Sequence, residues 1–263
     1  MNQTTITKFK TPLEKFKAQG YIQCKSLFTE AEAEKLIEDI QQAETIDGVS
    51  GLNKGAMTFY SGVYAKSPSL QAVVSQPKVI NFLQQIIGPN FWVRWDQAVA
   101  KGSGADTFPW HQDNAYNNLK DEHFQLWIAL TKTNSDNGGL WLVPKHQDKM
   151  LPHDKVENHM VFKGKPQNPI LIEADPGDAV LFSSFTLHST TPNITQETRW
   201  AYVIEYMSCN DVDPTVAPPY FIVARNGKPV AKFVRWYRGR LKVKNYLKYW
   251  RLYSFNLRKK LLG

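Results

Sequence analysis

Between residues 91 and 208 the chain is a succession of short apolar segments, and this pattern constrains the fold more than any other feature. The segments are FWVRWDQAVA, FQLWIALTKT, LWLVP, PILIEA, DAVLFSSFTLHS and RWAYVIEYMS. Turn clusters such as SDNGG and DPGD separate them, at spacings typical of the strands of an all-β barrel or sandwich. Helical segments do not alternate with these strands, which argues against a parallel α/β sheet.

The first 90 residues show mainly helical patterns instead of short apolar segments. They predict a short amphipathic helix, a strand from about Tyr21, and a second helix whose N-cap is Thr29, with Glu32 completing a capping box. A glycine-rich stretch at 47–62 is expected to be a loop, and two further helical segments fall near 67–74 and 77–87. The expected fold is therefore mainly β with flanking helices, an α+β arrangement.

Charge divides the chain into two parts. Residues 224–263 hold 13 lysines and arginines and no acidic residue, which leaves 19 basic against 24 acidic residues in the rest. A chain of 263 residues suits one large domain with an appendage. We expect a catalytic domain at 1–223, with its β core at about 91–208, and a basic aromatic tail at 224–263.

The tail is predicted to be helical. Val230, Val234, Tyr237 and Leu241 recur at helical spacing, and Gly239 is a candidate hinge before a second helix. Three interpretations are open: association with an anionic membrane surface, a helix that covers the barrel or a subunit interface, and nucleic-acid binding. The acidic body argues against wrapping DNA, and membrane association would make a lipid-linked substrate more plausible.

Two cysteines are too few for a disulfide framework in a domain of this size, and no signal peptide is recognisable. No apolar run approaches the length of a membrane span. These features favour a cytoplasmic protein, peripheral on a membrane if the tail binds one.

The tripeptide His-Gln-Asp occurs twice, at 111–113 and at 146–148. Alternate residues of an extended segment face the same side, so the histidine and aspartate of one copy can both point into a barrel. A third ligand from a distant strand, His188, would complete the two-histidine, one-carboxylate facial triad of non-haem Fe(II) oxygenases. Arg199, at the start of the next strand, would be buried deeper and would need an anion such as a dicarboxylate.

Most of the body resembles the phytanoyl-CoA dioxygenase family of Fe(II)/2-oxoglutarate oxygenases. The resemblance lies in PWHQD, DNGGLWLVPKHQD and PGDAVLFSSFTLHSTTPNITQETRW, in their order and spacing. It implies a double-stranded β-helix, or jelly-roll, with His111, Asp113 and His188 on iron. It also implies that Arg199 and Thr190 hold the distal carboxylate of 2-oxoglutarate.

The family's cofactors are Fe(II), 2-oxoglutarate and O2, with ascorbate as an optional reductant. Related halogenases replace the iron-binding carboxylate with a small residue, whereas this chain keeps Asp113, which favours hydroxylation or desaturation. The second His-Gln-Asp copy falls in a family loop, and His146 is expected to be a loop residue outside the iron site. From Asp148 to His188 the chain has only 40 residues, which would crowd the intervening strands.

Further pocket residues are predicted from strand alternation. On FQLWIALTKT, Trp127 shares a face with polar residues, whereas Leu126, Ile128 and Leu130 share the apolar face. Trp127 is therefore a candidate pocket residue. Gln97, on the strand before the triad, is a candidate for a hydrogen bond to 2-oxoglutarate or substrate, with a satisfied interior amide as the alternative.

Asn114, Tyr116 and Asn117 directly follow the proposed metal ligands and are candidates for substrate contact, with a plain surface loop as the alternative. The remaining histidines have no partner in the motif and are expected to be exposed: His123, His153 and His159.

The sequence as a whole predicts a 2-oxoglutarate-dependent dioxygenase that hydroxylates a small or lipid-linked metabolite with release of succinate and CO2. Two alternatives remain: a membrane-associated binding protein on the same fold that has lost turnover, and a cupin-like metalloenzyme that does not use 2-oxoglutarate. Neither the substrate nor the oligomeric state follows from the sequence.

Overall fold

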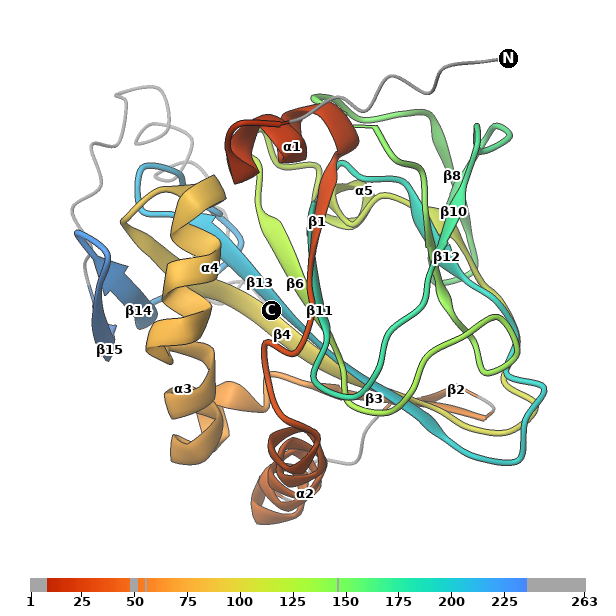
Figure 1. Cartoon of the computed structure of the whole chain (residues 1–263), viewed down its shortest axis with the longest axis horizontal. Coiled ribbons are helices and arrows are strands. Elements are labelled where there is room, and N and C mark those ends of the chain that lie inside the picture. The colour runs from red at the N-terminus through yellow and green to blue at the C-terminus, as the bar shows by residue number, and fades with distance from the viewer. Residues whose placement is uncertain (1–8, 48–51, 55, 146, 236–263) are drawn as a thin grey trace, which may run out of the picture.

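The computed structural model describes residues 9–47, 52–54, 56–145 and 147–235, and its strands form two main antiparallel sheets that pack against each other and a separate two-stranded hairpin (Figure 1). The helices are α1 (Pro12–Gln19), α2 (Glu30–Asp47), the 3-10 turn η1 (Tyr64–Lys66), α3 (Pro68–Val74), α4 (Pro77–Ile87) and α5 (Asn114–Asn117). The strands are β1 (Tyr21–Cys24), β2 (Leu52–Lys54), β3 (Met57–Ser61), β4 (Phe91–Lys101), β5 (Phe108–His111), β6 (Phe124–Ala129), β7 (Leu140–Leu142), β8 (His153–Val156), β9 (His159–Phe162), β10 (Ile170–Ile172), β11 (Ala179–Ser183), β12 (His188–Thr190), β13 (Arg199–Ser208), β14 (Tyr220–Arg225) and β15 (Lys228–Val234).

The larger sheet has the order β1-β11-β6-β13-β4-β14-β15, with β3 also paired to β4 and β2 to β3. The smaller sheet has the order β10-β7-β12-β5, and β8 and β9 form a separate hairpin. Neighbours in each sheet are mostly distant in sequence, as in a jelly roll, and this mainly β architecture with flanking helices confirms the expected fold.

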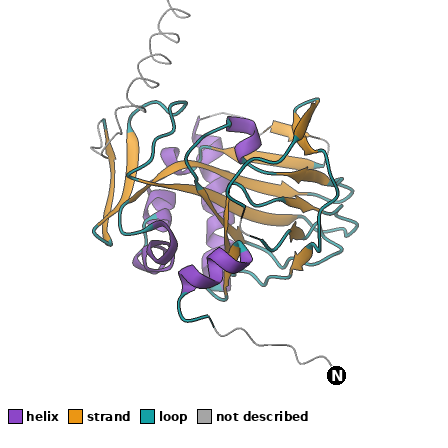
Figure 2. Cartoon of the chain, turned by 90° about the horizontal axis from the view of Figure 1, so that it is seen from above, coloured by secondary structure: helices purple, strands orange, loops and turns teal. Residues whose placement is uncertain are grey.

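The N-terminal helices cover the outer face of the larger sheet (Figure 2). One hydrophobic core joins Leu36 and Ile40 of α2 and Leu83 of α4 to sheet residues such as Leu126 and Tyr202. The predicted capping box starts α2, because the Thr29 amide donates to Glu32 Oε2 at 2.7 Å and the Glu32 amide donates to Thr29 Oγ1 at 3.2 Å. These helices leave the other face of the sheet free for the site.

The inner face of the larger sheet packs against the smaller sheet. Trp127, Val180 and Ala201 share a second core with Leu140 and Leu142 of β7. The alternation predicted for β6 is confirmed, since its even-numbered residues Leu126 and Ile128 lie in the outer core instead. The strands thus sort their side chains into a helix-covered face and a face that lines the barrel.

The prediction of a loop at 47–62 was wrong over most of the described part. Leu52–Lys54 and Met57–Ser61 form the antiparallel pair β2 and β3, and β3 continues the sheet along β4. Glycine content concealed a period-2 pattern in which Met57 and Phe59 are buried and Thr58 and Tyr60 are half-buried.

The helix predicted at the start of the tail was also wrong in its described part. Lys228–Val234 is strand β15, paired with β14, and Val230 and Val234 pack against the core around Trp92. A separation of four residues keeps two side chains on one face of a strand as well as of a helix, so the spacing did not discriminate. The predicted helical residues from Tyr237 onward, and His146 of the second His-Gln-Asp copy, lie outside the described residues. Within the described chain, no helix combines the length and apolarity needed to cross a membrane.

Candidate active site

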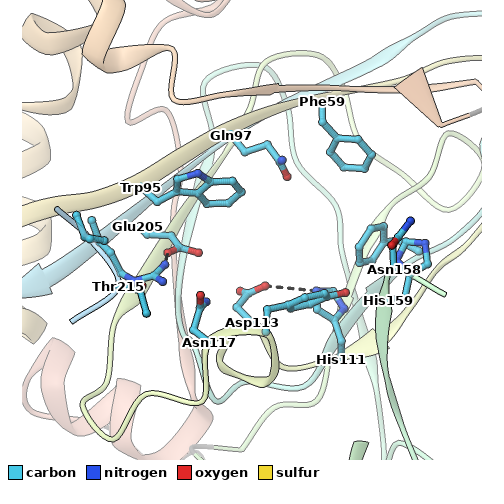
Figure 3. Close-up of a pocket in the computed structure, with 14 residues that line it drawn as sticks. Phe59, Trp95, Gln97, His111, Asp113, Asn117, Asn158, His159, Glu205 and Thr215 are labelled. Atoms are coloured by element: carbon cyan, nitrogen blue, oxygen red, sulfur yellow. Dashed lines mark hydrogen bonds and ion pairs between the residues drawn. The ribbon is translucent and has the colours of Figure 1, made fainter. Parts of the chain in front are cut away.

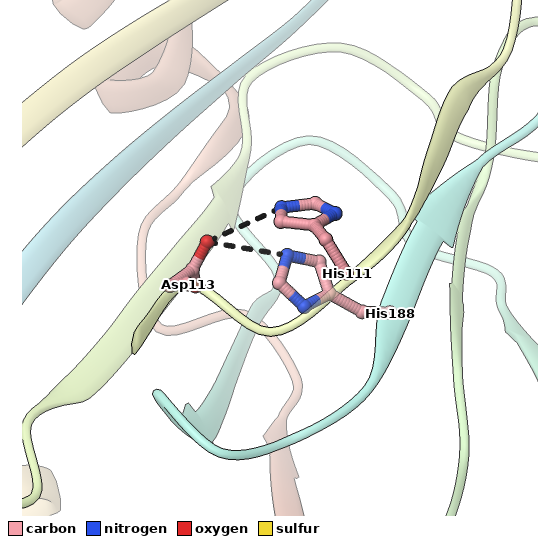
Figure 4. Close-up of side chains that lie close together, drawn as sticks. All are labelled: His111, Asp113 and His188. Carbon is pink, nitrogen blue, oxygen red and sulfur yellow. Dashed lines mark ion pairs between the residues drawn. The ribbon is translucent and has the colours of Figure 1, made fainter. Parts of the chain in front are cut away.

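His111, Asp113 and His188 come together inside the barrel (Figure 4). His111 ends β5 and His188 begins β12, and the two residues are direct partners across this antiparallel pair. Asp113 follows two residues after His111, at the start of α5. Their candidate ligand atoms all lie within 4.8 Å of one another, so the structure brings the three predicted metal ligands together.

Backbone carbonyls fix the orientation of both imidazole rings. His111 Nδ1 lies 2.8 Å from the Pro109 carbonyl oxygen, and His188 Nδ1 lies 3.0 Å from that of Thr186. A carbonyl only accepts, so each Nδ1 carries the proton and each Nε2 presents its lone pair. These Nε2 atoms lie 3.3 Å and 3.6 Å from Asp113 Oδ1.

The protonation states suit a divalent cation. Burial lowers the pKa of His188 to about 4, so its ring is neutral near neutral pH. Burial opposes ionisation of Asp113, but the neighbouring His188 and His111 hold the pKa of its carboxyl at about 2. Two imidazole Nε2 atoms and one carboxylate that border one cavity form the donor set that non-haem iron takes.

A buried cationic recess lies at the end of β4 and β13. Lys101 and Arg199 face each other across these strands and are 0% and 3% exposed. Lys101 Nζ donates to Thr190 Oγ1 at 2.9 Å and Arg199 Nη2 donates to the Gly138 carbonyl at 3.0 Å, whereas Arg199 Nε is buried without a partner.

No carboxylate among the described residues forms an ion pair with either cation. Burial lowers the pKa of Lys101 to about 7, with the charge of Arg199 as the second cause, and burial alone lowers the pKa of Arg199 to about 10. A buried pair of cations is costly without an anion. The recess is therefore suited to one carboxylate of a dicarboxylic acid, as 2-oxoglutarate requires.

Two adjoining chambers, a small inner one and a larger outer one, lie beside the recess and the triad. The inner chamber, of about 110 Å³, is bordered by Arg199, Thr190 and all three triad residues. The outer chamber, of about 440 Å³, is also bordered by His111 and Asp113 (Figure 3). Both are bordered by Gln97, so a molecule in the recess and a molecule in the outer chamber would meet at the triad.

The structure places four more predicted residues at this pocket. Trp127 borders the inner chamber and Gln97 borders both, with its Nε2 donating to Ser61 Oγ at 2.8 Å. Tyr116 and Asn117 border the outer chamber, and the Tyr116 ring meets His111 edge to face at 5.7 Å between centroids.

Asn114 differs from the prediction, since its side chain serves the fold. It is fully buried, its Nδ2 donates to the Leu119 carbonyl at 2.8 Å, and its Oδ1 accepts from the Leu119 amide at 2.9 Å. It closes the turn after α5 and does not border either chamber.

The expectation that the three remaining histidines are exposed was wrong. His123 is fully buried, 3.6 Å from a carboxylate oxygen of Glu205. His153 and His159 are partly buried, and His159 meets the Phe108 ring edge to face at the border of the outer chamber.

Sequence reasoning missed Lys101 in the recess, and Phe59, Arg94, Trp95 and Glu205 in the chambers. Lys101 could have been found, because it lies four residues after Gln97 on the same strand and so shares its face. A facial triad beside a buried, anion-deficient cationic recess defines a non-haem iron, 2-oxoglutarate-dependent oxygenase.

Comparison with known proteins identifies the family. The model of the phytanoyl-CoA dioxygenase family matches residues 16–201, and the chain belongs to that family. A probable alpha-ketoglutarate-dependent hypophosphite dioxygenase of Stutzerimonas stutzeri is 25% identical over 73% of this chain and 76% of its own. An ectoine dioxygenase of Bordetella bronchiseptica is 22% identical over 80% of this chain and 77% of its own.

The solved structures agree in fold. The epimerase SnoN, in complex with Fe3+, alpha ketoglutarate and nogalamycin RO, superposes with a TM-score of 0.63 at 16% identity, covering 83% of this chain and 94% of its own. The protein is thus an iron- and 2-oxoglutarate-dependent dioxygenase of the phytanoyl-CoA dioxygenase family.

Proposed function

We propose that the protein hydroxylates a C–H bond of a small organic molecule. In this reaction 2-oxoglutarate and O2 are consumed, one oxygen atom enters the substrate as a hydroxyl group, and the other enters succinate as CO2 is released. The observation that carries the proposal is the placement of the His111, Asp113 and His188 triad where a buried cationic recess meets a larger open chamber.

In this proposal His111 and His188, through their Nε2 atoms, and the carboxylate of Asp113 would hold Fe(II). The bound iron, together with 2-oxoglutarate and O2, supplies the oxidising power that a C–H bond requires. The protein's part is to keep both imidazole rings oriented. Each Nδ1–H donates to a backbone carbonyl, so each Nε2 carries no proton and its lone pair can bind the metal.

Arg199, Lys101 and Thr190 would hold the distal carboxylate of 2-oxoglutarate. Arg199 offers its unpaired Nε, and Lys101 and Thr190 already form a joined pair of polar groups. Binding the carboxylate would cancel much of the positive charge of the recess, so binding energy orients the co-substrate toward the triad. Gln97 and Trp127 would contact the co-substrate from the barrel wall.

Tyr116 and Asn117 would contact the substrate in the outer chamber. Tyr116 stands against the His111 ring, and its hydroxyl accepts from the Met160 amide at 3.2 Å, which ties α5 to the β8–β9 hairpin. This hairpin and α5 would limit the access of water to the reacting carbon.

The proposal is tested by incubating the purified protein with Fe(II), 2-oxoglutarate and ascorbate. We expect slow release of succinate even without substrate, and its loss in His111→Ala. Equal succinate from the wild type and the variant would refute the enzymatic function and favour a binding protein on this fold. Metal-dependent turnover at a rate that does not depend on 2-oxoglutarate would favour a cupin-like metalloenzyme.

We further propose that the basic tail, residues 224–263, brings the enzyme to an anionic membrane surface, where a lipid-linked substrate would be accessible. The proposal is supported by its 13 positive charges and by the exposed Lys228 and Lys232 on β15. Flotation with anionic and with neutral liposomes tests it. Equal recovery with both kinds would refute it, as would undiminished recovery after removal of residues 236–263.

A further inference from the structure

The outer chamber holds a carboxylate, Glu205, that no step of the proposed reaction uses. Glu205 lies on β13, is 4% exposed and borders both chambers. Figure 3 shows its carboxylate directed into the space between Trp95, Asn117 and Asp113. Its Oε2 accepts from Arg94 Nη1, whereas Oε1 receives only a long bond of 3.4 Å from Gln125 Nε2. Glu205 therefore keeps acceptor capacity toward the chamber.

A β-bulge in β4 brings Arg94 and Trp95 to the same wall. Along β13, Glu205 pairs with Trp95 and the next residue, Tyr206, pairs with Val93, so Arg94 is the extra residue. A bulge of this kind turns two consecutive side chains to one face of a sheet. The two side chains, Arg94 and Trp95, border the outer chamber together.

One guanidinium and two carboxylates lie at this wall, so its net charge is negative when Glu205 is ionised. Arg94 lies between two carboxylates, Glu205 and Asp213, and Asp213 is fully buried. His123 does not balance the second carboxylate, because burial lowers its pKa to about 3. Among the described residues that border the outer chamber, Arg94 is the sole lysine or arginine.

Aromatic rings form much of the remaining wall. Phe59, Trp95, Phe108 and Tyr116 all border the outer chamber. Trp95 and Tyr116 are 37% and 43% exposed, so both rings are accessible to a molecule that enters the open chamber. Ring faces around a carboxylate are an environment that stabilises an organic cation by both charge pairing and cation–π attraction.

We propose that the substrate carries a positively charged nitrogen group, an ammonium or amidinium, which pairs with Glu205 inside the aromatic wall and so presents a nearby C–H bond to the triad. This inference rests on the proposed function and specifies its substrate class. Burial raises the pKa of Glu205 to about 7, and a cationic partner would offset that cost by stabilising the ionised carboxylate.

The opposite assignment, an anionic substrate on Arg94, fits the geometry less well. Arg94 already donates from Nε to Asp213 and from Nη1 to Glu205. An anion in the outer chamber would also lie beside the carboxyl groups of Glu205 and Asp113, which both border it, and like charges disfavour that placement.

The experiment compares three probes of the same shape: benzamidine, which is cationic, benzamide, which is neutral, and benzoate, which is anionic. Each is titrated by calorimetry into the protein with Mn(II) and 2-oxoglutarate, so that binding is read without turnover. We expect benzamidine to bind the wild type at least tenfold more tightly than the other two. In Glu205→Gln we expect benzamidine to lose at least tenfold in affinity while benzamide changes less than twofold.

Glu197→Gln, at an exposed position in the turn before β13, is the matched control and should leave all three affinities and the succinate rate unchanged. The proposal is overturned if benzoate or benzamide binds as tightly as benzamidine, if benzamidine does not bind the wild type, or if Glu205→Gln binds it normally. Unchanged benzamide binding shows that this variant is folded. Failure of succinate release would refute the proposed function separately, because none of these titrations depends on turnover.

Discussion

Replacing Lys101 with methionine gives a sharp test of the recess, because it should stabilise the free protein and weaken 2-oxoglutarate binding. The pKa of Lys101 falls from 10.5 to about 7 through burial beside Arg199. At about 1.4 kcal/mol per pKa unit, the ionised side chain costs the folded state at most about 5 kcal/mol. Methionine keeps the length and removes the charge, at the cost of the bond to Thr190.

We therefore expect Lys101→Met to gain about 1–3 kcal/mol of stability without 2-oxoglutarate, which in a chain of this length is a rise in Tm of about 2–10 °C. If Lys101 binds the distal carboxylate as proposed, the same change also removes a charge-assisted hydrogen bond to the co-substrate. Such bonds contribute about 1.5–3 kcal/mol, so the Kd for 2-oxoglutarate should rise about 10- to 150-fold.

The pH dependence has a definite sign. The penalty is fully present below pH 7, the folded pKa, and disappears as pH rises toward 10.5, the unfolded value. The stability advantage of Lys101→Met over the wild type should therefore shrink across this interval.

Thermal melts with Mn(II), recorded at several pH values with and without 2-oxoglutarate, measure these effects together. A variant that melts below the wild type at pH 7 without 2-oxoglutarate would refute the burial argument. A variant that gains as much Tm from 2-oxoglutarate as the wild type would refute the role of Lys101 in binding.

Three further tests, with four substitutions, address the site and the residues that support it. Asp113→Ala should abolish metal binding measured by calorimetry, whereas Asp148→Ala, at an exposed position of the second His-Gln-Asp copy, should retain it; equal affinities would show that the wrong copy has been assigned. Asn114→Ala should lose about 2–4 kcal/mol of stability in urea titrations, because it leaves the amide and carbonyl of Leu119 unpaired in a buried turn; a variant as stable as the wild type would contradict this. Gly138→Ala should lower both Tm and 2-oxoglutarate affinity. Gly138 has a φ of +90°, and a Cβ there would lie 2.5 Å from Lys101 Cδ. An unchanged affinity would mean that the recess tolerates displacement of Lys101.

The sequence predicted those parts of the fold and site that depend on local pattern. Alternation placed Trp127 correctly, and the spacing of His111, Asp113 and His188 anticipated a triad that the pairing of β5 with β12 assembles. The alternation of side chains is a property of each strand by itself, so it can be predicted without knowing which strands are its neighbours.

Features that depend on pairing between distant strands could not be predicted. The bulge at Arg94 breaks the alternation of β4, so no count along the strand puts Arg94 and Trp95 on one face. His123 was expected to be exposed because nothing near it in sequence shows that Glu205, 82 residues later, lies beside it. Asn114 illustrates a further ambiguity, because a buried amide that closes a turn has the same sequence signature as a substrate ligand.

Strand β4 runs along the whole site, and its side chains that face the barrel border the outer chamber, the triad and the recess in that order along the strand. Arg94 and Trp95 border the outer chamber, Gln97 borders both chambers, and Lys101 reaches the recess. The extra residue of the bulge, Arg94, lies seven residues before Lys101, so its removal would re-aim the substrate wall while leaving the pairing of Lys101 with Arg199 in register. The strand therefore carries two kinds of position. Those near Arg94 and Trp95 can change as such an enzyme diverges toward new substrates, whereas Lys101 must be kept for the same co-substrate to bind.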